Sequence, residues 1–88
     1  MREVEIAKVY RHYKGNYYYV LGIAEYTEKY DILVIYHALY DECDTYARPL
    51  EMFIEEVPED KENPTGQKYR FEVVGEIDRD ATNQTRRV

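Results

Sequence analysis

The chain lacks most of the residues on which enzyme active sites and metal sites are commonly built. It has no serine and no tryptophan, and Cys43 is the only cysteine among its 88 residues. A single cysteine excludes an internal disulfide and a cysteine-rich zinc site. Cys43 also lies among three carboxylates, and neighbouring negative charge disfavours the reactive thiolate. We therefore expect a protein that is not an enzyme and that uses neither a cofactor nor a metal.

Long apolar runs and glycine-rich segments are also missing. No apolar stretch approaches the roughly 18 residues needed to cross a bilayer. The first residues, Met1–Glu5, do not resemble a signal peptide. The four glycines are too scattered to form a phosphate-binding loop. These absences predict a cytoplasmic protein with no membrane contact.

Positive charge is in the minority, because 18 acidic residues outnumber 12 basic ones and give a net charge of -6. Such a chain repels a long phosphate backbone, so we expect no binding to duplex nucleic acid. Four basic side chains are nevertheless close together in the sequence, namely Lys8, Arg11, His12 and Lys14. They permit a local anion site, in which histidine would switch its charge near neutral pH, although such residues also suit a solvated hairpin strand.

Tyrosine is the residue that the chain has in excess, with 11 copies. A tyrosine joins a flat apolar ring to a hydroxyl that needs a partner, so it suits a surface that is dry on one side and wet on the other. The rings could stack on a nucleobase, or they could fill the core with their hydroxyls at its rim. Strand alternation places Tyr17 and Tyr19 on one face and Tyr18 on the other, so at least one of the three should be exposed.

The apolar pattern predicts one all-β domain of about five short strands. We expect strands over residues 4–13, 17–25, 32–40 and 69–73, and either a strand or a short helical turn over 50–54. The segment 14–16 should form a turn, since Gly15 and Asn16 tolerate positive φ.

The predicted strand over 32–40 is apolar on both faces, and a chain of this size cannot readily cover two faces of a sheet. We therefore predict a small SH3-like barrel over residues 1–77, with a rim that self-associates into a homo-oligomer. His37, inside this strand, should be a hydrogen-bonded core residue. The polar residues 78–88 should form a flexible tail.

Four separated blocks of the sequence resemble the bacterial domain-of-unknown-function family number 1653. The blocks are residues 10–15, residues 20–24, residues 33–36 followed by Leu39 and Tyr40, and residues 48–53. They occur in the order that the family shows and cover about half of the chain. The resemblance implies a compact, mostly β domain from bacteria or their phages. It implies no particular activity and no catalytic residues.

Stacking rings beside local positive charge predict a non-catalytic module that binds a small anionic, nucleotide-like ligand and senses or sequesters it. The predicted ligand-binding residues are Tyr10, Arg11, His12, Tyr13, Lys14, Tyr17, Tyr19 and Arg48. For Arg48, a structural role, buried or paired with Asp44 or Glu51, is favoured over ligand contact. The alternative is a protein–protein interaction barrel that docks a peptide or a partner domain through its aromatic edge. A binder of single-stranded RNA is disfavoured by the sign of the net charge.

Overall fold

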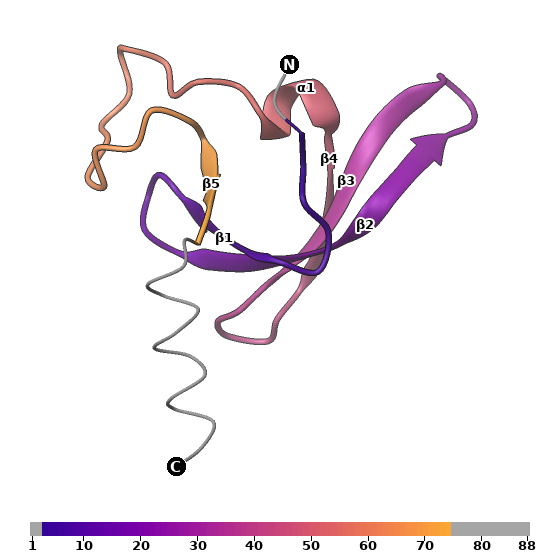
Figure 1. Ribbon diagram of the computed structural model, residues 1–88, viewed down its shortest axis with the longest axis horizontal. Coiled ribbons are helices and arrows are strands. Elements are labelled where there is room, and N and C mark those ends of the chain that lie inside the picture. The colour runs from indigo at the N-terminus through magenta and orange to yellow at the C-terminus, as the bar shows by residue number, and fades with distance from the viewer. Residues whose placement is uncertain (1–2, 75–88) are drawn as a thin grey trace.

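The computed structural model describes residues 3–74, which form a five-stranded antiparallel sheet and one short helix (Figure 1). The strands are β1 (Val9–His12), β2 (Tyr17–Tyr26), β3 (Asp31–Ala38), β4 (Thr45–Pro49) and β5 (Phe71–Val73), and helix α1 (Leu50–Phe53) follows β4. The strand order is β4-β3-β2-β1-β5. The prediction of an all-β domain with a short helical turn is confirmed. Within these residues, no helix is long and apolar enough to cross a membrane.

Strands β1 and β2 form the predicted hairpin around Gly15. Its φ of 115° lies in the region that favours glycine, and its N–H donates to the His12 carbonyl at 2.8 Å. The first strand is shorter than predicted, because the chain turns before β1 at Ala7, which has a φ of 59°. The N–H of Ala7 donates to the Val20 carbonyl at 2.8 Å, so the chain just before β1 still lies beside β2.

Strands β2 and β3 form the longest hairpin, and it projects beyond the rest of the sheet (Figure 1). Its end turns at Tyr30, which has a φ of 58° and donates its N–H to the Tyr26 carbonyl at 2.6 Å. The pairing register shifts between Val20 and Gly22, so β2 carries a bulge at this point. A bulge increases the local twist of a strand, which helps this hairpin to bend away from the plane of the other strands.

Strand β4 was not predicted, because Thr45–Pro49 is short, follows an acidic loop and ends in proline. It pairs with β3 through Tyr36 and Tyr46, and through Val34 and Arg48. Proline is tolerated here because β4 is an edge strand and Pro49 is its last residue. The connection at Pro49 leads directly into helix α1.

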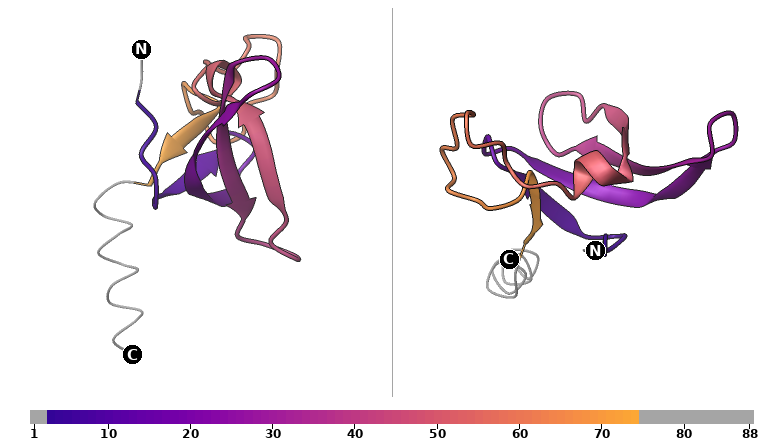
Figure 2. Two further views of the ribbon diagram at one scale, coloured as in Figure 1. Left: turned by 90° about the vertical axis from the view of Figure 1, so that its right-hand side faces the viewer. Right: turned by 90° about the horizontal axis from the view of Figure 1, so that it is seen from above.

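The predicted barrel is not closed. Strands β4 and β5 are the two edges of the sheet in residues 3–74 and do not pair with each other. Helix α1 and the connection after it carry the chain from one edge to the other, as the views in Figure 2 also show. Strand β5 has only three residues, which pair with β1. The predicted tail, residues 78–88, lies outside the described residues.

The core lies on the face of the sheet that α1 covers, and it is mainly aromatic. Its buried members are Tyr10, Val20, Val34, Tyr36, Phe53 and Phe71. The ring of Phe53 from α1 stacks on Phe71 from β5, with centroids 4.1 Å apart and planes 5° apart. Tyr10 meets Phe53 edge-on at 5.3 Å. These contacts fasten α1, which follows β4 in the chain, to β1 and β5 at the other end of the strand order.

The opposite face of the sheet is only partly covered. Residues Leu33, Ile35 and His37 alternate with the buried Val34 and Tyr36 and are half-buried. His37 Nδ1 lies 2.9 Å from the Ala38 carbonyl oxygen, so the predicted hydrogen bond is present. The residue is not in the core, however, because its ring packs on this second face. The domain thus buries one face of β3 and leaves the other face partly exposed.

Replacing Phe53 with alanine should reduce the free energy of unfolding by about 3–5 kcal/mol, because the fully buried ring leaves a cavity beside Phe71. Met52 precedes it in α1 and is 44% exposed, so Met52→Ala is the matched control and should change the value by less than about 0.5 kcal/mol. Urea denaturation of both variants measures the difference. Equal losses would contradict the role assigned to the stack.

Candidate functional site

A hollow of about 170 Å³ opens on the aromatic face of the sheet, next to the core. Its lining residues come from every strand and are His12, Tyr18, Tyr36, Tyr46, Arg48 and Phe71. Cross-strand register brings them together, since His12 is opposite Phe71 and Tyr36 is opposite Tyr46. Residues on one face of neighbouring strands lie close together, so the sheet itself builds this site.

Tyr18 forms the centre of the aromatic wall. The centroid of its ring lies 5.5 Å from that of Tyr36 and 5.6 Å from that of Phe71, and both contacts are edge-on. Its hydroxyl lies 2.6 Å from the hydroxyl of Tyr40, which fixes the ring in place. Burial, together with this hydrogen bond, raises the pKa of Tyr18, so the phenol stays protonated and neutral. Tyr18 therefore serves as an apolar wall rather than as an acid or base.

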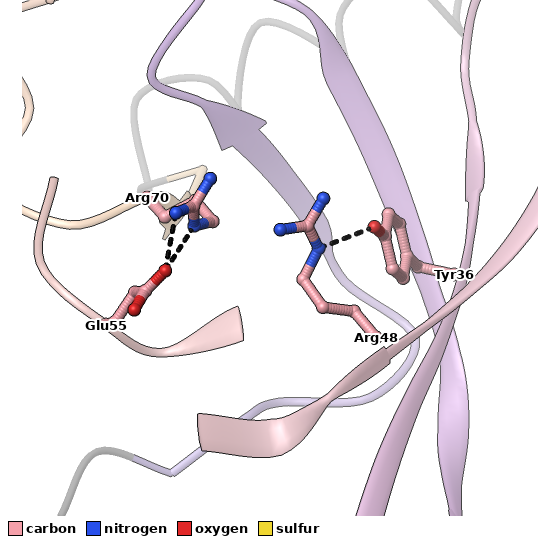
Figure 3. A network of polar contacts seen from close by, with 4 residues as sticks. All are labelled: Tyr36, Arg48, Glu55 and Arg70. Atoms are coloured by element: carbon pink, nitrogen blue, oxygen red, sulfur yellow. Dashed lines mark hydrogen bonds and ion pairs between the residues drawn. The ribbon is translucent and has the colours of Figure 1, made fainter. Parts of the chain in front are cut away.

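Arg48 brings positive charge into the hollow. Its Nε donates to the Tyr36 hydroxyl at 3.1 Å, and its guanidinium carbon lies 5.6 Å from the centre of the Phe71 ring. Among residues 3–74, no carboxylate forms an ion pair with Arg48, and no buried side-chain nitrogen lacks a partner. The two Nη groups are therefore accessible. Figure 3 shows them pointing away from Tyr36.

A second guanidinium nearby is already neutralised. Arg70 donates from Nε to Glu55 Oε1 at 2.9 Å, and its Nη2 contacts the same oxygen. Its guanidinium carbon also lies 5.8 Å from the centre of the Tyr13 ring. Figure 3 shows this pair on the side toward which the Nη groups of Arg48 point. The two arginines thus differ, since Arg70 has a carboxylate partner and Arg48 has none among the described residues.

His12 is uncharged at neutral pH. The centroid of its ring lies 4.5 Å from that of Tyr13 and 4.8 Å from that of Phe71. Its Nδ1 accepts the Lys14 N–H at 3.1 Å. Burial, followed by the charges of Arg48, Arg70 and Lys14, lowers the pKa of His12 to about 4. A neutral ring that accepts at Nδ1 carries its proton on Nε2. The predicted charge switch near neutral pH is therefore not what this environment produces.

The polar groups that line the hollow are mainly hydrogen-bond donors. Arg48 offers its Nη groups, His12 offers Nε2–H, and Tyr36 accepts from Arg48 and keeps its own proton to donate. Donors beside aromatic rings suit a planar ligand with a negative group rich in acceptors. A cation would find little here, since no group of three metal-ligating side chains lies within residues 3–74.

The structure brings only two of the predicted site residues, His12 and Arg48, into the hollow. Tyr10 and Tyr13 are buried, and the Tyr10 hydroxyl accepts the Glu5 N–H at 2.8 Å. Lys14 is exposed, with its ammonium 5.9 Å from the centre of the Tyr13 ring. These three residues therefore support or surround the hollow and do not line it.

The remaining predicted residues, Arg11, Tyr17 and Tyr19, lie on the opposite face, because they alternate with His12 and Tyr18. The Nε of Arg11 donates to Gln67 Oε1 at 2.7 Å. Gln67 is buried and donates in turn to the Arg11 carbonyl at 3.0 Å. Arg11 thus ties β1 to the connection before β5. The eight predicted residues do not form one pocket.

Sequence reasoning missed Tyr18, Tyr36, Tyr46 and Phe71 as site residues. Alternation already separated Tyr18 from its neighbours and placed Tyr36 among the apolar residues of β3. The position of Tyr46 depended on β4, which was not predicted. Only the register between β3 and β4 reveals that Tyr36, Tyr46 and Arg48 share one face.

The stability of the protein should fall as the pH is lowered from about 7 to about 4, in part because of His12. Unfolded histidine takes up a proton near pH 6.5, whereas folded His12 does so near 4, so the unfolded state binds more protons in this window. His12→Gln should therefore lose less stability over the same range. Thermal unfolding across this pH range measures the difference, with His37→Gln as the matched loss of a histidine elsewhere. Identical pH profiles for wild type and His12→Gln would refute this explanation.

The chain is similar to a known family in sequence and to a solved structure in both sequence and fold. The model of a family described as "Protein of unknown function (DUF1653)" matches residues 8–73, which include β1 to β5. The crystal structure of a DUF1653 protein from Bordetella bronchiseptica is similar, with 34% identity and a TM-score of 0.66 over 81% of this chain and 88% of that chain. The curated proteins contain no match. The chain belongs to the DUF1653 family.

Proposed function

We propose that the chain is a non-catalytic module that binds a small anionic, nucleotide-like ligand in the hollow around Arg48. The observation that carries this proposal is a guanidinium that lies over Phe71, reaches the hollow and has no carboxylate partner among residues 3–74. The module would sense or sequester its ligand. The binding site differs from the one predicted from sequence, because it uses Tyr18, Tyr36 and Tyr46 instead of Tyr17 and Tyr19.

The aromatic wall supports the ring-binding part of the proposal. Tyr46 is 40% exposed and lies 5.7 Å from Tyr36, so it presents a ring surface at the rim of the hollow. Stacking of a base on an aromatic side chain contributes about 1–3 kcal/mol in single-strand binders. Tyr18 is fixed by Phe71 and by its hydrogen bond to Tyr40, so a bound ring would meet a wall that is already ordered.

Local charge supports the anion-binding part. The whole chain carries a charge of -6, which opposes a long polyanion, yet the guanidinium of Arg48 lines the hollow without a carboxylate partner among residues 3–74. A small anion can use this limited positive region without approaching the acidic remainder of the surface. Charge-assisted hydrogen bonds from a guanidinium are about twice as strong as neutral ones, so Arg48 should be the main anchor.

A second candidate function, docking of a partner protein, is favoured by a separate surface. A groove of about 440 Å³ lies between the end of the β2–β3 hairpin and α1. Its lining includes Tyr30, which is 80% exposed, together with Ile32 and Met52. Exposed apolar side chains of this kind often mark interaction sites. Isolation of a stoichiometric protein partner that is lost in Tyr30→Ala, with no small molecule bound, would favour this second function.

Uridine and adenosine monophosphates are suitable first probes of the proposed function. At least one should raise the melting temperature in proportion to the logarithm of its concentration once the site is saturated. Arg48→Gln should weaken binding at least about tenfold, because a hydrogen bond from a charged group contributes about 1.5–3 kcal/mol. Tyr46→Ala should weaken it as well, since it removes a ring from the rim of the hollow.

Arg11→Gln and Tyr17→Ala are the matched controls, because they alter the same two residue types on the opposite face of the sheet. Both should bind as the wild type does. The proposal would be wrong if neither nucleotides nor other ring-bearing anions stabilised the protein, or if the control variants lost binding while Arg48→Gln kept it.

A further inference from the structure

We infer that the hollow takes a single planar ring that carries its own carboxylate, a class that includes benzoates and carboxylated pyrimidines. This inference rests on the proposed function and narrows it. A complete nucleotide is a ring, a sugar and a phosphate, whereas the hollow holds one ring and one negative group, so the rest of a nucleotide would lie outside it. The argument depends on the size of the hollow, the place of Arg48 in its wall, and the local charge.

The size of the hollow favours one ring. Its volume is about 170 Å³. A protein cavity of about 150 Å³ is known to hold benzene, whereas pockets for drug-sized ligands measure about 300–1,000 Å³. A fused two-ring system such as a purine would therefore extend out of the hollow.

The place of Arg48 requires that the charge lie on the ring or directly beside it. Arg48 lines the same hollow as Tyr18 and Phe71, so a ring within the hollow is already next to the guanidinium. In a nucleotide, the ribose separates the base from its phosphate. A carboxylate attached to the ring instead reaches Arg48 while the ring stays against Tyr18 and Tyr46.

The shape of the available donors fits a carboxylate. The Nε of Arg48 is occupied by the Tyr36 hydroxyl at 3.1 Å, which leaves the two Nη groups as a planar pair. Two parallel N–H donors match the two oxygens of a carboxylate. The Tyr36 proton and the Nε2–H of His12 are further donors in the lining, and both are neutral.

The local charge fits one negative charge rather than two. Arg48 contributes one positive charge, Arg70 is balanced by Glu55, and His12 is neutral at pH 7. Lys14 is exposed and lies beside Tyr13, where solvent screens it. A carboxylate would be balanced by Arg48, whereas a phosphate dianion would retain an excess negative charge in an acidic protein.

The test compares small ligands that differ in one property at a time, added to the full chain and followed by isothermal titration and by amide NMR shifts. Benzoate and orotate are the single-ring carboxylates, benzamide removes the charge, and 2-naphthoate adds a second ring. Uridine and adenosine monophosphates place the charge away from the ring. We expect saturable binding of benzoate or orotate, with at least tenfold weaker binding of every other probe.

Variants locate the binding. Arg48→Gln should abolish binding of the single-ring carboxylates and Tyr46→Ala should weaken it, whereas Arg11→Gln should leave it unchanged. Tyr46 is exposed at the rim, so its variant remains informative if Arg48→Gln does not fold. The inference would be overturned if single-ring carboxylates bound to Arg48→Gln as well as to the wild type. If Arg48→Gln does not fold, undiminished binding to Tyr46→Ala would overturn it instead.

The probes also separate the inference from the function on which it rests. Arg48-dependent binding of the nucleotides at the strength of benzoate or better would leave the proposed function standing and overturn the single-ring inference. Equal binding of benzoate and 2-naphthoate would overturn the inference in the same way. If no ring-bearing anion binds at all, both the inference and the proposed function are wrong.

Discussion

The stack of Phe53 on Phe71 is the contact on which the rest of the structure depends. The two rings come from α1 and from β5, at opposite ends of an open sheet, and lie 4.1 Å apart. Because β4 and β5 do not pair, side-chain packing does what hydrogen bonds do in a closed barrel. The stack also sets the position of β5 relative to β4, and so places Phe71 beneath the guanidinium of Arg48. The fold and the candidate site therefore share one aromatic contact.

The positive character of the hollow in an acidic chain results from how a few carboxylates are placed. Glu55 lies just after α1, and Arg70 lies just before β5. Their ion pair therefore joins the two ends of the connection between α1 and β5. No carboxylate does the same for Arg48 within residues 3–74, although 18 acidic residues are present in the chain. Arg48 is held instead by a neutral hydroxyl, from Tyr36, which orients it without cancelling its charge.

The parts of the fold that could be predicted from sequence are those with local causes. The turn at Gly15 follows from its tolerance of positive φ, and the apolar runs of β2 and β3 were evident in the sequence. Strand β4 could not be predicted in this way, because Thr45–Pro49 owes its pairing to β3 rather than to its own apolar pattern. The sequence did not reveal that the barrel is open, because an excess of apolar faces does not determine whether the two edge strands pair.

The candidate site was harder to predict than the fold, because it depends on which face of the sheet is covered. Alternation correctly grouped Tyr10 with His12 and separated both from Arg11, but it could not say which group faces α1. The position of α1 on the face of Tyr36 decides this, and Arg48 joins the site only through its register with Val34. Cross-strand register is a property of the folded chain, so these neighbours were not visible in the sequence.

The size of the hollow follows from the same constraint that makes the core thin. A chain of 88 residues has few side chains with which to enclose a space, and here Tyr36 and Phe71 belong both to the core and to the lining. Enlarging the hollow would remove packing from the Phe53–Phe71 contact that holds the sheet edges together. A small site, with one charged anchor and aromatic walls taken from the core, is therefore the site that this fold can provide without losing stability.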